Sequence, residues 1–185
     1  QARLGSTRFP NKILEKIQGK TIIQILLERL SMSKKVDKII VATTNLDQDD
    51  LLCEKILGFG YSIFRGSEKN VLSRYYQAAK KNKASHIIRI TGDCPLVDPE
   101  LVDDMIEEYL QNKYDYLSNI NPPTYPDGLD VEVFSFHTLK NAFTNAKLSY
   151  DKEHVTTFIN KSNSFKKYNF TNKQNFSSER WTVDE

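Results

Sequence analysis

The segment His86–Glu100 reads HIIRITGDCPLVDPE, and it contains a strand, a polar turn and a helix start in that order. Its first six residues are rich in β-branched side chains, as buried strands are. The strand ends in a Gly-Asp pair, because Pro95 cannot continue it simply. Asp98 has the chemistry of a helix N-cap, and Pro99 suits the first helical position. The segment therefore predicts a strand and then a helix, with Asp93 at the carboxyl end of the strand.

Short apolar runs and longer helical periods continue to alternate on both sides of this segment. Strands are predicted at residues 38–43, 61–64, 86–91, 114–118, 129–135, 165–171 and around 181. Helices are predicted at residues 21–30, 70–83, 101–110, 136–146 and 150–163. Such alternation is typical of the α/β class, in which helices cover both faces of a mostly parallel sheet. We therefore expect a three-layer α/β/α fold.

Size and charge limit the classes of protein that this chain can represent. Its 185 residues predict a single domain, residues 1–185, and the net charge of +2 argues against nucleic acid or an anionic membrane as a partner. It has no membrane-length apolar run and no secretory leader, so we expect a cytoplasmic protein. Because it starts at Gln1 and stops within strand-like chemistry at residues 180–185, it is expected to be truncated at both ends. Cys53 and Cys94 lack the spacing of a disulfide framework or a zinc site.

The opening segment combines cations, hydroxyls and a glycine in a way that suits a polyphosphate. Residues 3–12 read RLGSTRFPNK and hold three cations within ten positions, directly after what should be a strand. Gly5 lets backbone amides approach a ligand, and the Arg and Lys side chains neutralise its charge. The segment lacks the Gly and Lys-Ser/Thr spacing of a Walker loop. A solvated basic loop is the alternative interpretation.

Asp93 is the first candidate metal ligand. In open α/β sheets, ligands bind at the carboxyl ends of the strands. A carboxylate placed there beside phosphate-binding cations is the kind of ligand that Mg²⁺ uses. An aspartate that serves only as a turn residue is the alternative interpretation.

Six motifs occur in order and together resemble the cytidylyltransferase family, which contains the CMP-Kdo and CMP-sialic acid synthetases. They are residues 1–12 (QARLGSTRFPNK), 41–43 (VAT), 90–96 (ITGDCPL), 126–132 (PDGLDVE), 153–156 (EHVT) and 180–184 (RWTVD). The most similar branch is the SpsF-like proteins of spore-coat and surface polysaccharide synthesis. The resemblance spans the chain, and the first and third motifs are specific in combination. A further segment, which opens with Arg65-Gly66 and ends in VLSRY at residues 71–75, is similar to a family stretch near the nucleotide. It departs from the family at Asn70, where the family usually has an acidic residue.

The resemblance implies a Rossmann-like nucleotide-binding sheet of the nucleotide-diphospho-sugar transferase type. It also implies Mg²⁺-dependent transfer of CMP from CTP to a sugar acid, with release of pyrophosphate, in surface or spore-coat polysaccharide synthesis. The residues implied to bind the nucleotide are Arg3, Gly5, Ser6, Arg8, Lys12, Thr43, Arg65 and Gly92. Asp93 and Asp184 are the implied Mg²⁺ ligands. Lys12, Arg8 and Asp93 are the expected catalytic residues, because attack on the α-phosphorus builds negative charge that they and the metal stabilise.

Candidate residues for the sugar side lie in two of the motifs. They are Asp127, Gly128, Asp130, Glu132 and His154. Residues 121–128 form a turn-rich loop that is too irregular for an ordinary strand-to-helix connection, and such loops are often functional. Each candidate also has a structural alternative, since Asp-Gly is a common turn, strand acids can face water, and a helical histidine is often structural.

Two other classes of protein stay open at this point. A glycosyltransferase that uses a nucleotide sugar would have a similar fold, but the first half of the chain lacks its usual pair of close acids. A non-catalytic relative that assists polysaccharide assembly would keep the fold without turnover. The family further implies a homodimer, with residues 129–171 as the contact region. The identity of the sugar acid is not encoded in any motif of this chain.

Overall fold

The computed structural model describes residues 1–5 and 9–183 of the chain. The helices are α1 (Ile22–Leu30), α2 (Asp50–Gly58), α3 (Val71–Lys81), α4 (Pro99–Asn112), α5 (Phe136–Asn145), α6 (Ser149–His154) and α7 (Thr157–Lys161), with 3₁₀ turns η1 (Lys12–Leu14) and η2 (Asp47–Asp49). The strands are β1 (Lys16–Ile17), β2 (Lys20–Thr21), β3 (Ile40–Thr44), β4 (Ser62–Gly66), β5 (His86–Arg89), β6 (Tyr116–Ser118), β7 (Glu132–Ser135) and β8 (Lys167–Asn169). The α/β class that the sequence predicts is confirmed.

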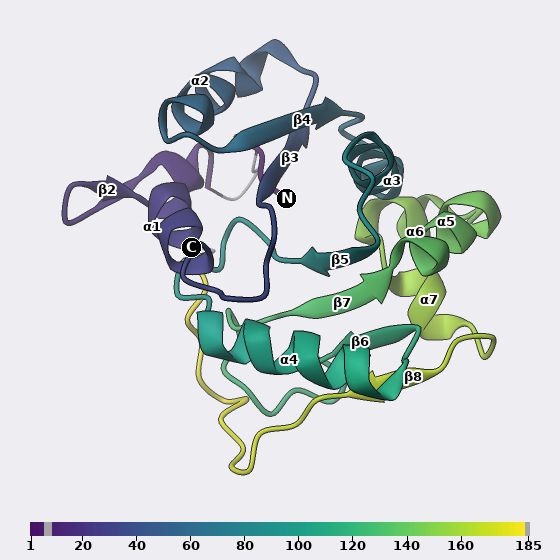
Figure 1. Ribbon diagram of the computed structural model, residues 1–185. Coiled ribbons are helices and arrows are strands. Elements are labelled where there is room, and N and C mark those ends of the chain that lie inside the picture. Colours follow the sequence, from purple (N-terminus) through teal and green to yellow (C-terminus); the bar gives the residue numbers. More distant parts are fainter. Residues whose placement is uncertain (6–8, 184–185) are drawn as a thin grey trace.

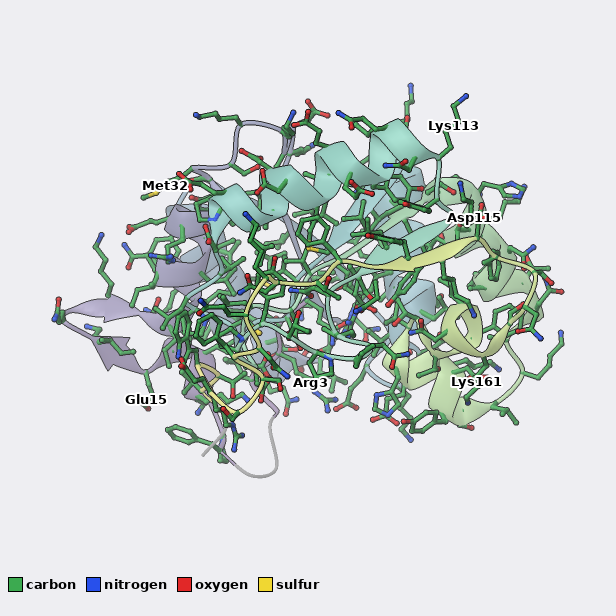
Figure 2. The ribbon with its side chains drawn as sticks, turned by 90° about the horizontal axis from the view of Figure 1, so that it is seen from below. Arg3, Glu15, Met32, Lys113, Asp115 and Lys161 are labelled. Carbon is green, nitrogen blue, oxygen red and sulfur yellow. The ribbon has the colours of Figure 1, made fainter. Side chains whose placement is uncertain are left out.

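The strands form two main sheets and a small hairpin (Figure 1). β3 pairs with β4 in parallel, and the larger sheet has the order β5-β7-β6-β8. Within the larger sheet, β7 is antiparallel to both of its neighbours, whereas β6 and β8 are parallel. Figure 2 shows Asp115 beside the start of β8, where its carboxylate accepts a hydrogen bond from the Lys166 amide at 2.8 Å. The antiparallel β1–β2 hairpin leads into α1.

Alternation along β6 and β7 separates two hydrophobic cores. Leu117 and Val133 belong to the core that includes Met105 of α4. Their chain neighbours Tyr116 and Phe134 belong to the core beneath α3, α5 and α7. Because successive side chains of a strand point to opposite faces, the larger sheet lies between two helical layers (Figure 1). The three-layer architecture is therefore confirmed.

Local chemistry explains the helix starts. The Asp98 carboxylate accepts a hydrogen bond from the Glu100 amide at 3.0 Å, and Pro99 is the first residue of α4, as the sequence predicts. The Thr21 hydroxyl caps α1 by accepting from the Gln24 amide at 3.3 Å. Helix α2 has no counterpart among the predicted helices. It starts directly after the 3₁₀ turn η2.

The helix predicted at residues 150–163 is instead two short helices. The break is at Val155, whose φ of 61° and ψ of −59° are far from helical values. The Thr156 amide donates a 2.6 Å hydrogen bond to the His154 carbonyl, which closes a tight γ-turn around Val155. No feature of the sequence marks this break, because a β-branched residue is among the least expected at positive φ.

The strand predicted around Trp181 is also not formed. That segment instead follows the turn-rich loop, and Asp127 and Arg180 make an isolated parallel bridge. The Trp181 amide donates to the Asp127 carbonyl at 2.6 Å, and the Asp127 amide donates to the Glu179 carbonyl at 3.0 Å. Backbone groups of residues 179–181, which were expected to bond within a sheet, therefore make hydrogen bonds to Asp127 of the turn-rich loop instead.

Candidate active site

The start of the chain runs between β3 and β5. The Gln1 amine donates to the Ile90 carbonyl at 2.8 Å, and the Ala2 amide donates to the Ala42 carbonyl at 3.2 Å. Gly92 permits this approach, because a Cβ there would lie 3.0 Å from both the Ala2 Cβ and the Gln1 carbonyl oxygen. The two residues that lead into the predicted phosphate segment therefore pass directly over the Gly-Asp turn.

Two ion pairs connect this segment to neighbouring elements. The Lys12 ammonium lies 3.4 Å from an Asp93 carboxylate oxygen, and the Lys12 side chain is only 12% exposed. The Arg3 guanidinium lies 3.2 Å from Glu68 in a more exposed pair. The fold thus brings together Lys12 and Asp93, which are 81 residues apart.

A polar cleft of about 320 Å³ opens beside these pairs. The predicted site residues that line it are Arg3, Lys12, Gly92, Asp93 and His154. The charged side chains that line it without having been predicted are Glu68, Arg74, Arg89 and Glu153. The predicted residues that do not line it are Gly5, Thr43, Arg65, Asp127, Gly128, Asp130 and Glu132. Ser6, Arg8 and Asp184 lie outside the described residues.

Asp49 organises the base of the phosphate segment, and the sequence analysis missed it. This fully buried carboxylate accepts hydrogen bonds from the Leu4 amide at 2.7 Å and from the Thr43 hydroxyl at 3.2 Å. The Thr44 amide and hydroxyl donate to it as well. Thr43 was predicted to contact the nucleotide, whereas in the structure its hydroxyl donates a hydrogen bond to Asp49. Asp49 carries no sequence signal, because it belongs to an ordinary acidic run at residues 47–50.

Arg65 and Gly5 contact the segment that follows β3. The Arg65 guanidinium donates to the Thr44 carbonyl at 3.0 Å and to the Leu46 carbonyl at 2.8 Å, and it pairs with Asp50 at 2.6 Å. A Cβ on Gly5 would lie 2.6 Å from the Gln48 amide nitrogen. Arg65 and Gly5 therefore both lie against residues 44–50, which connect β3 to α2.

Glu132 lies at the centre of a buried polar network. One carboxylate oxygen accepts from the Tyr116 hydroxyl at 2.5 Å and from the Thr156 hydroxyl at 2.7 Å, and the other accepts from Arg89. Burial, with the Glu132 carboxylate beside it, raises the pKa of Tyr116 above its ordinary value. Glu132 is 1% exposed, so the structure places it behind Arg89, which is the member of the network that lines the cleft.

The turn-rich loop and the carboxyl-terminal segment lie against each other near Asp93. Gly128 has a φ of 109°, and a Cβ there would lie 2.7 Å from the Trp181 carbonyl carbon. The Val183 amide donates to the Asp93 backbone carbonyl at 3.0 Å. Burial, followed by the Asp127 carboxylate, raises the pKa of Asp130 to about 6. The loop thus adds acidic groups on the Asp93 side.

His154 reaches the cleft from the γ-turn that separates α6 and α7. Its side chain is exposed, and its ring lies 4.2 Å from the Tyr150 ring, centroid to centroid. The turn also directs Thr156 toward Glu132. One strained turn therefore positions both His154 at the cleft and Thr156 in the buried network around Glu132.

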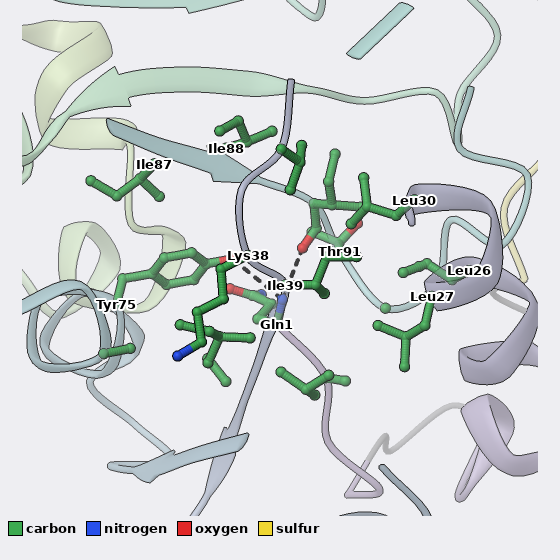
Figure 3. Close-up of a pocket in the computed structure, with 18 of the residues that line it drawn as sticks. Gln1, Leu26, Leu27, Leu30, Lys38, Ile39, Tyr75, Ile87, Ile88 and Thr91 are labelled. Atoms are coloured by element: carbon green, nitrogen blue, oxygen red, sulfur yellow. Dashed lines mark hydrogen bonds between the residues drawn. The ribbon is translucent and has the colours of Figure 1, made fainter. Parts of the chain in front are cut away.

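A second cavity, of about 170 Å³, lies between β3 and β5 (Figure 3). Apolar side chains such as Leu26, Leu30 and Ile87 dominate its walls. Figure 3 shows Gln1 among the residues that line this cavity, and its amine lies 3.4 Å from the Tyr75 hydroxyl. These walls are unsuited to a polyphosphate, because a charged group in apolar surroundings loses its solvation. The polar cleft is therefore the candidate active site.

The residues at the cleft are consistent with a hard cation bound together with a substrate. Among the described residues, no group of three or more His, Cys, Asp or Glu side chains forms a metal cage. Mg²⁺ commonly uses one or two carboxylates and completes its shell with phosphate oxygens and water. The partly exposed Asp93 carboxylate fits that pattern. Cys53 and Cys94 are buried free thiols.

This fold, with cations and a carboxylate where the sheet meets a polar cleft, defines the chain as a nucleotidyltransferase-type α/β domain. A family model described as cytidylyltransferase matches residues 1–182. The chain belongs to the cytidylyltransferase family.

Two relatives match most of the chain. It is 48% identical over 159 residues to an uncharacterised protein of Methanocaldococcus jannaschii, covering 86% of this chain and 64% of that protein. It is 37% identical over 164 residues to the spore coat polysaccharide biosynthesis protein SpsF of Bacillus subtilis, covering 86% of this chain and 67% of that protein. The chain thus spans about two thirds of the length of these relatives.

Solved structures agree with the family. A cytidylyltransferase from Leptospira borgpetersenii has a TM-score of 0.95 and 35% identity, with 99% of this chain and 78% of that chain covered. A CMP:2-keto-3-deoxy-manno-octonic acid synthetase, solved with CTP, has a TM-score of 0.70 at 17% identity, with 92% and 88% covered, and supports the fold alone. Within the described residues, no helix has the length and apolar character that crossing a bilayer requires.

Proposed function

We propose that this protein transfers CMP from CTP to a sugar acid and releases pyrophosphate. The observation that carries the proposal is the Lys12–Asp93 pair, which joins the phosphate segment to the Gly-Asp turn at the cleft. Both residues lie within residues 1–182, which match the cytidylyltransferase family. The match to the cytidylyltransferase family over residues 1–182 supports CTP as the nucleotide here.

In the proposed reaction, a hydroxyl oxygen of the sugar acid attacks the α-phosphorus of CTP. A new P–O bond forms, the bond from the α-phosphorus to the bridging oxygen breaks, and pyrophosphate leaves with that electron pair. The hydroxyl proton passes to solvent. Lys12 and Arg3 neutralise the phosphate charge, which increases on the leaving group as the bond breaks. The Asp49 contacts hold the segment that presents these cations, and preorganised charge of this kind lowers the barrier.

We further propose that Asp93, together with Asp184, holds Mg²⁺. When bound, this ion supplies Lewis-acid stabilisation of charge on the phosphates. The hydrogen bond from the Val183 amide to the Asp93 carbonyl supports the pairing, because it brings the residue before Asp184 to Asp93. Asp127, Gly128 and Asp130 are proposed to contact the sugar acid from the neighbouring loop, and His154 from the other side of the cleft.

The biological setting that we propose is surface or spore-coat polysaccharide synthesis by a cytoplasmic homodimer. The similarity to SpsF supports the pathway. Exposed apolar side chains at Leu148 and Tyr150 support a dimer contact within residues 129–171. Light scattering of the purified full-length protein tests the dimer, and a monomer at micromolar concentration would contradict it.

Thermal unfolding with each nucleoside triphosphate, with and without Mg²⁺, tests the proposed function. A ligand at a hundredfold excess over its dissociation constant stabilises the folded state by about 2.7 kcal/mol. For a chain of this size that corresponds to a rise of roughly 5–10 °C in the unfolding midpoint. We expect this rise with CTP and Mg²⁺, followed by pyrophosphate release when sugar acids are added.

The variants Lys12→Ala and Asp93→Asn are expected to abolish the CTP-dependent rise. Lys20→Ala is the matched control, because Lys20 pairs with Glu28 at the surface, away from the cleft. The absence of any rise with CTP in the full-length protein would overturn the enzyme and favour a non-catalytic relative. A rise with a nucleotide sugar instead would favour a glycosyltransferase.

A further inference from the structure

Arg74 is a buried cation at the cleft to which the sequence resemblance assigns no role of its own. It lies in the first turn of α3, is 3% exposed, and lines the cleft together with Lys12 and Arg89. A buried guanidinium is costly unless an anion or several acceptors surround it. The partners of Arg74 therefore indicate whether its charge is structural.

The contacts of Arg74 do not neutralise it. One terminal nitrogen donates to the Ser67 carbonyl at a long 3.3 Å, and the Nε atom is buried with no hydrogen-bond partner among the described residues. Within the same residues, no carboxylate forms an ion pair with it. Burial is the largest influence on the pKa of Arg74 and lowers it, nearby Arg3 lowers it further, and the Asp49 and Glu68 carboxylates raise it without reversing the direction.

The other cations of the cleft differ from Arg74 in this respect. Arg3 pairs with Glu68, Lys12 pairs with Asp93, and Arg89 pairs with Glu132. A network of buried donors surrounds the carboxylate of the last pair, which marks it as structural. Arg74 is therefore the buried cation of this set that makes no ion pair with a carboxylate of the described residues.

The start of α3 adds to the positive potential beside Arg74. Val71, the first residue of this eleven-residue helix, lines the same cleft, and the Asn70 side chain caps the helix by accepting from the Ser73 amide at 2.9 Å. A helix N-terminus favours an anion, and the neutral Asn70 does not supply one.

We propose that Arg74 and the N-terminus of α3 form a subsite for a phosphoryl group of the bound nucleotide. This inference rests on the proposed function, since it assigns a further contact to the same ligand. A phosphoryl group fits better than a sugar carboxylate, because Arg74 lies near Arg3 of the phosphate segment. A guanidinium can also donate two parallel hydrogen bonds to phosphate oxygens.

The test compares CTP, inorganic pyrophosphate and cytidine as ligands for the full-length wild-type protein and for Arg74→Met, by isothermal titration calorimetry. We expect CTP to bind at least tenfold more weakly to the variant, while the affinity for cytidine stays within twofold. Because the substitution removes an uncompensated buried charge, the unfolding midpoint without ligand should stay equal or rise. A merely structural arginine would lower that midpoint and leave the ratio of CTP to cytidine affinity unchanged.

Two further variants sharpen the result. Arg29→Met is the matched control, because Arg29 donates to the Val97 carbonyl from α1 and lies outside the cleft lining; its CTP affinity should match that of the wild type. Arg74→Lys keeps a charge but loses the guanidinium fork, so CTP affinity should fall by an intermediate factor. It also serves as the test if the methionine variant does not fold.

The outcomes separate this inference from the proposed function. If wild-type protein binds CTP and the Arg74 variants bind it equally well, the subsite is overturned and the function stands. If the wild type binds pyrophosphate but not CTP, and Arg74→Met no longer binds pyrophosphate, the phosphoryl subsite is supported and CTP is overturned as the nucleotide. If wild-type protein binds neither ligand, both are overturned.

Discussion

At the scale of single residues, the charged side chains at and near the cleft differ in the partners that stabilise their charge. Lys12 and Asp93 balance each other, and both still line the cleft. Asp49 is buried, and four donors from the phosphate segment and the end of β3 satisfy its carboxylate. Asp130 is the opposite case, because like charges and burial both disfavour its ionised form.

Asp130 should give the protein a measurable pH dependence. Its folded pKa is raised to about 6, whereas an aspartate in an unfolded chain titrates near 3.9. Between those values the folded state holds a proton that the unfolded state has released, so the free energy of unfolding falls as the pH rises through this window. Asp130→Asn should remove this fall and raise the unfolding midpoint near neutral pH by roughly 2–4 °C.

Calorimetry from about pH 4 to about pH 8, in a buffer with a chelator, measures the effect of Asp130. Asp37→Asn is the control, because Asp37 is an exposed aspartate that lies outside the cleft lining and is not among the charges that raise the pKa of Asp130. A stability profile for Asp130→Asn that keeps the wild-type slope would contradict the assignment.

At the scale of elements, connections rather than strands and helices position the site. The γ-turn at Val155 carries His154 to the cleft, and the loop around Gly128 holds the carboxyl-terminal segment. Both depend on backbone conformations that most residues avoid. Strain of this kind persists only where neighbouring contacts compensate for it.

Gly128→Ala should detach the carboxyl-terminal segment. An added Cβ would lie 2.7 Å from the Trp181 backbone, and the φ of 109° would itself be strained by about 1 kcal/mol or more. Trp181 is the sole tryptophan of the sequence, so its fluorescence reports on this segment directly. We expect red-shifted emission and faster acrylamide quenching, together with loss of CMP transfer. Gly19→Ala is the control, because Gly19 also has positive φ but has no atom within 4 Å of an added Cβ; equal spectra for both variants would contradict the contact.

At the scale of the whole molecule, the Glu132 network joins parts of the chain that are far apart in sequence. It connects β5 and β6 through β7 to the turn between α6 and α7. The strands on which it lies separate the two hydrophobic cores. The same network supports Arg89 at the cleft, so stability and site geometry are linked.

Removing the Glu132 carboxylate should therefore be costly. Breaking one partner of a buried ion pair typically costs about 3–5 kcal/mol, and Glu132→Leu would also leave the Arg89 charge without a partner. We expect the unfolding midpoint to fall by roughly 6–20 °C. Differential scanning calorimetry provides the measurement. Glu28→Leu removes an exposed partner of Lys20 and should change the midpoint little; similar losses for the two variants would show that the network adds nothing.

Much of this protein follows from local patterns in its sequence. Hydrophobic periodicity predicts the α/β class and the positions of most helices, and Asp98-Pro99 predicts the start of α4. These features depend on residues a few positions apart, which is the range over which periodicity and capping act. The motifs at residues 1–12 and 90–96 likewise indicate the family, because their chemistry is contiguous.

The tertiary structure alone determined the rest. The sequence assigns no role to Asp49 beneath the phosphate segment or to Arg74 beside the cleft, and Glu132, although it lies in the motif at residues 126–132, is buried behind Arg89. The roles of these residues depend on contacts that close long loops of the chain. The break at Val155 is held by Thr156 and its hydrogen bond to a residue 24 positions away. Burial and electrostatic partners of this kind are properties of the assembled core, so no local pattern encodes them.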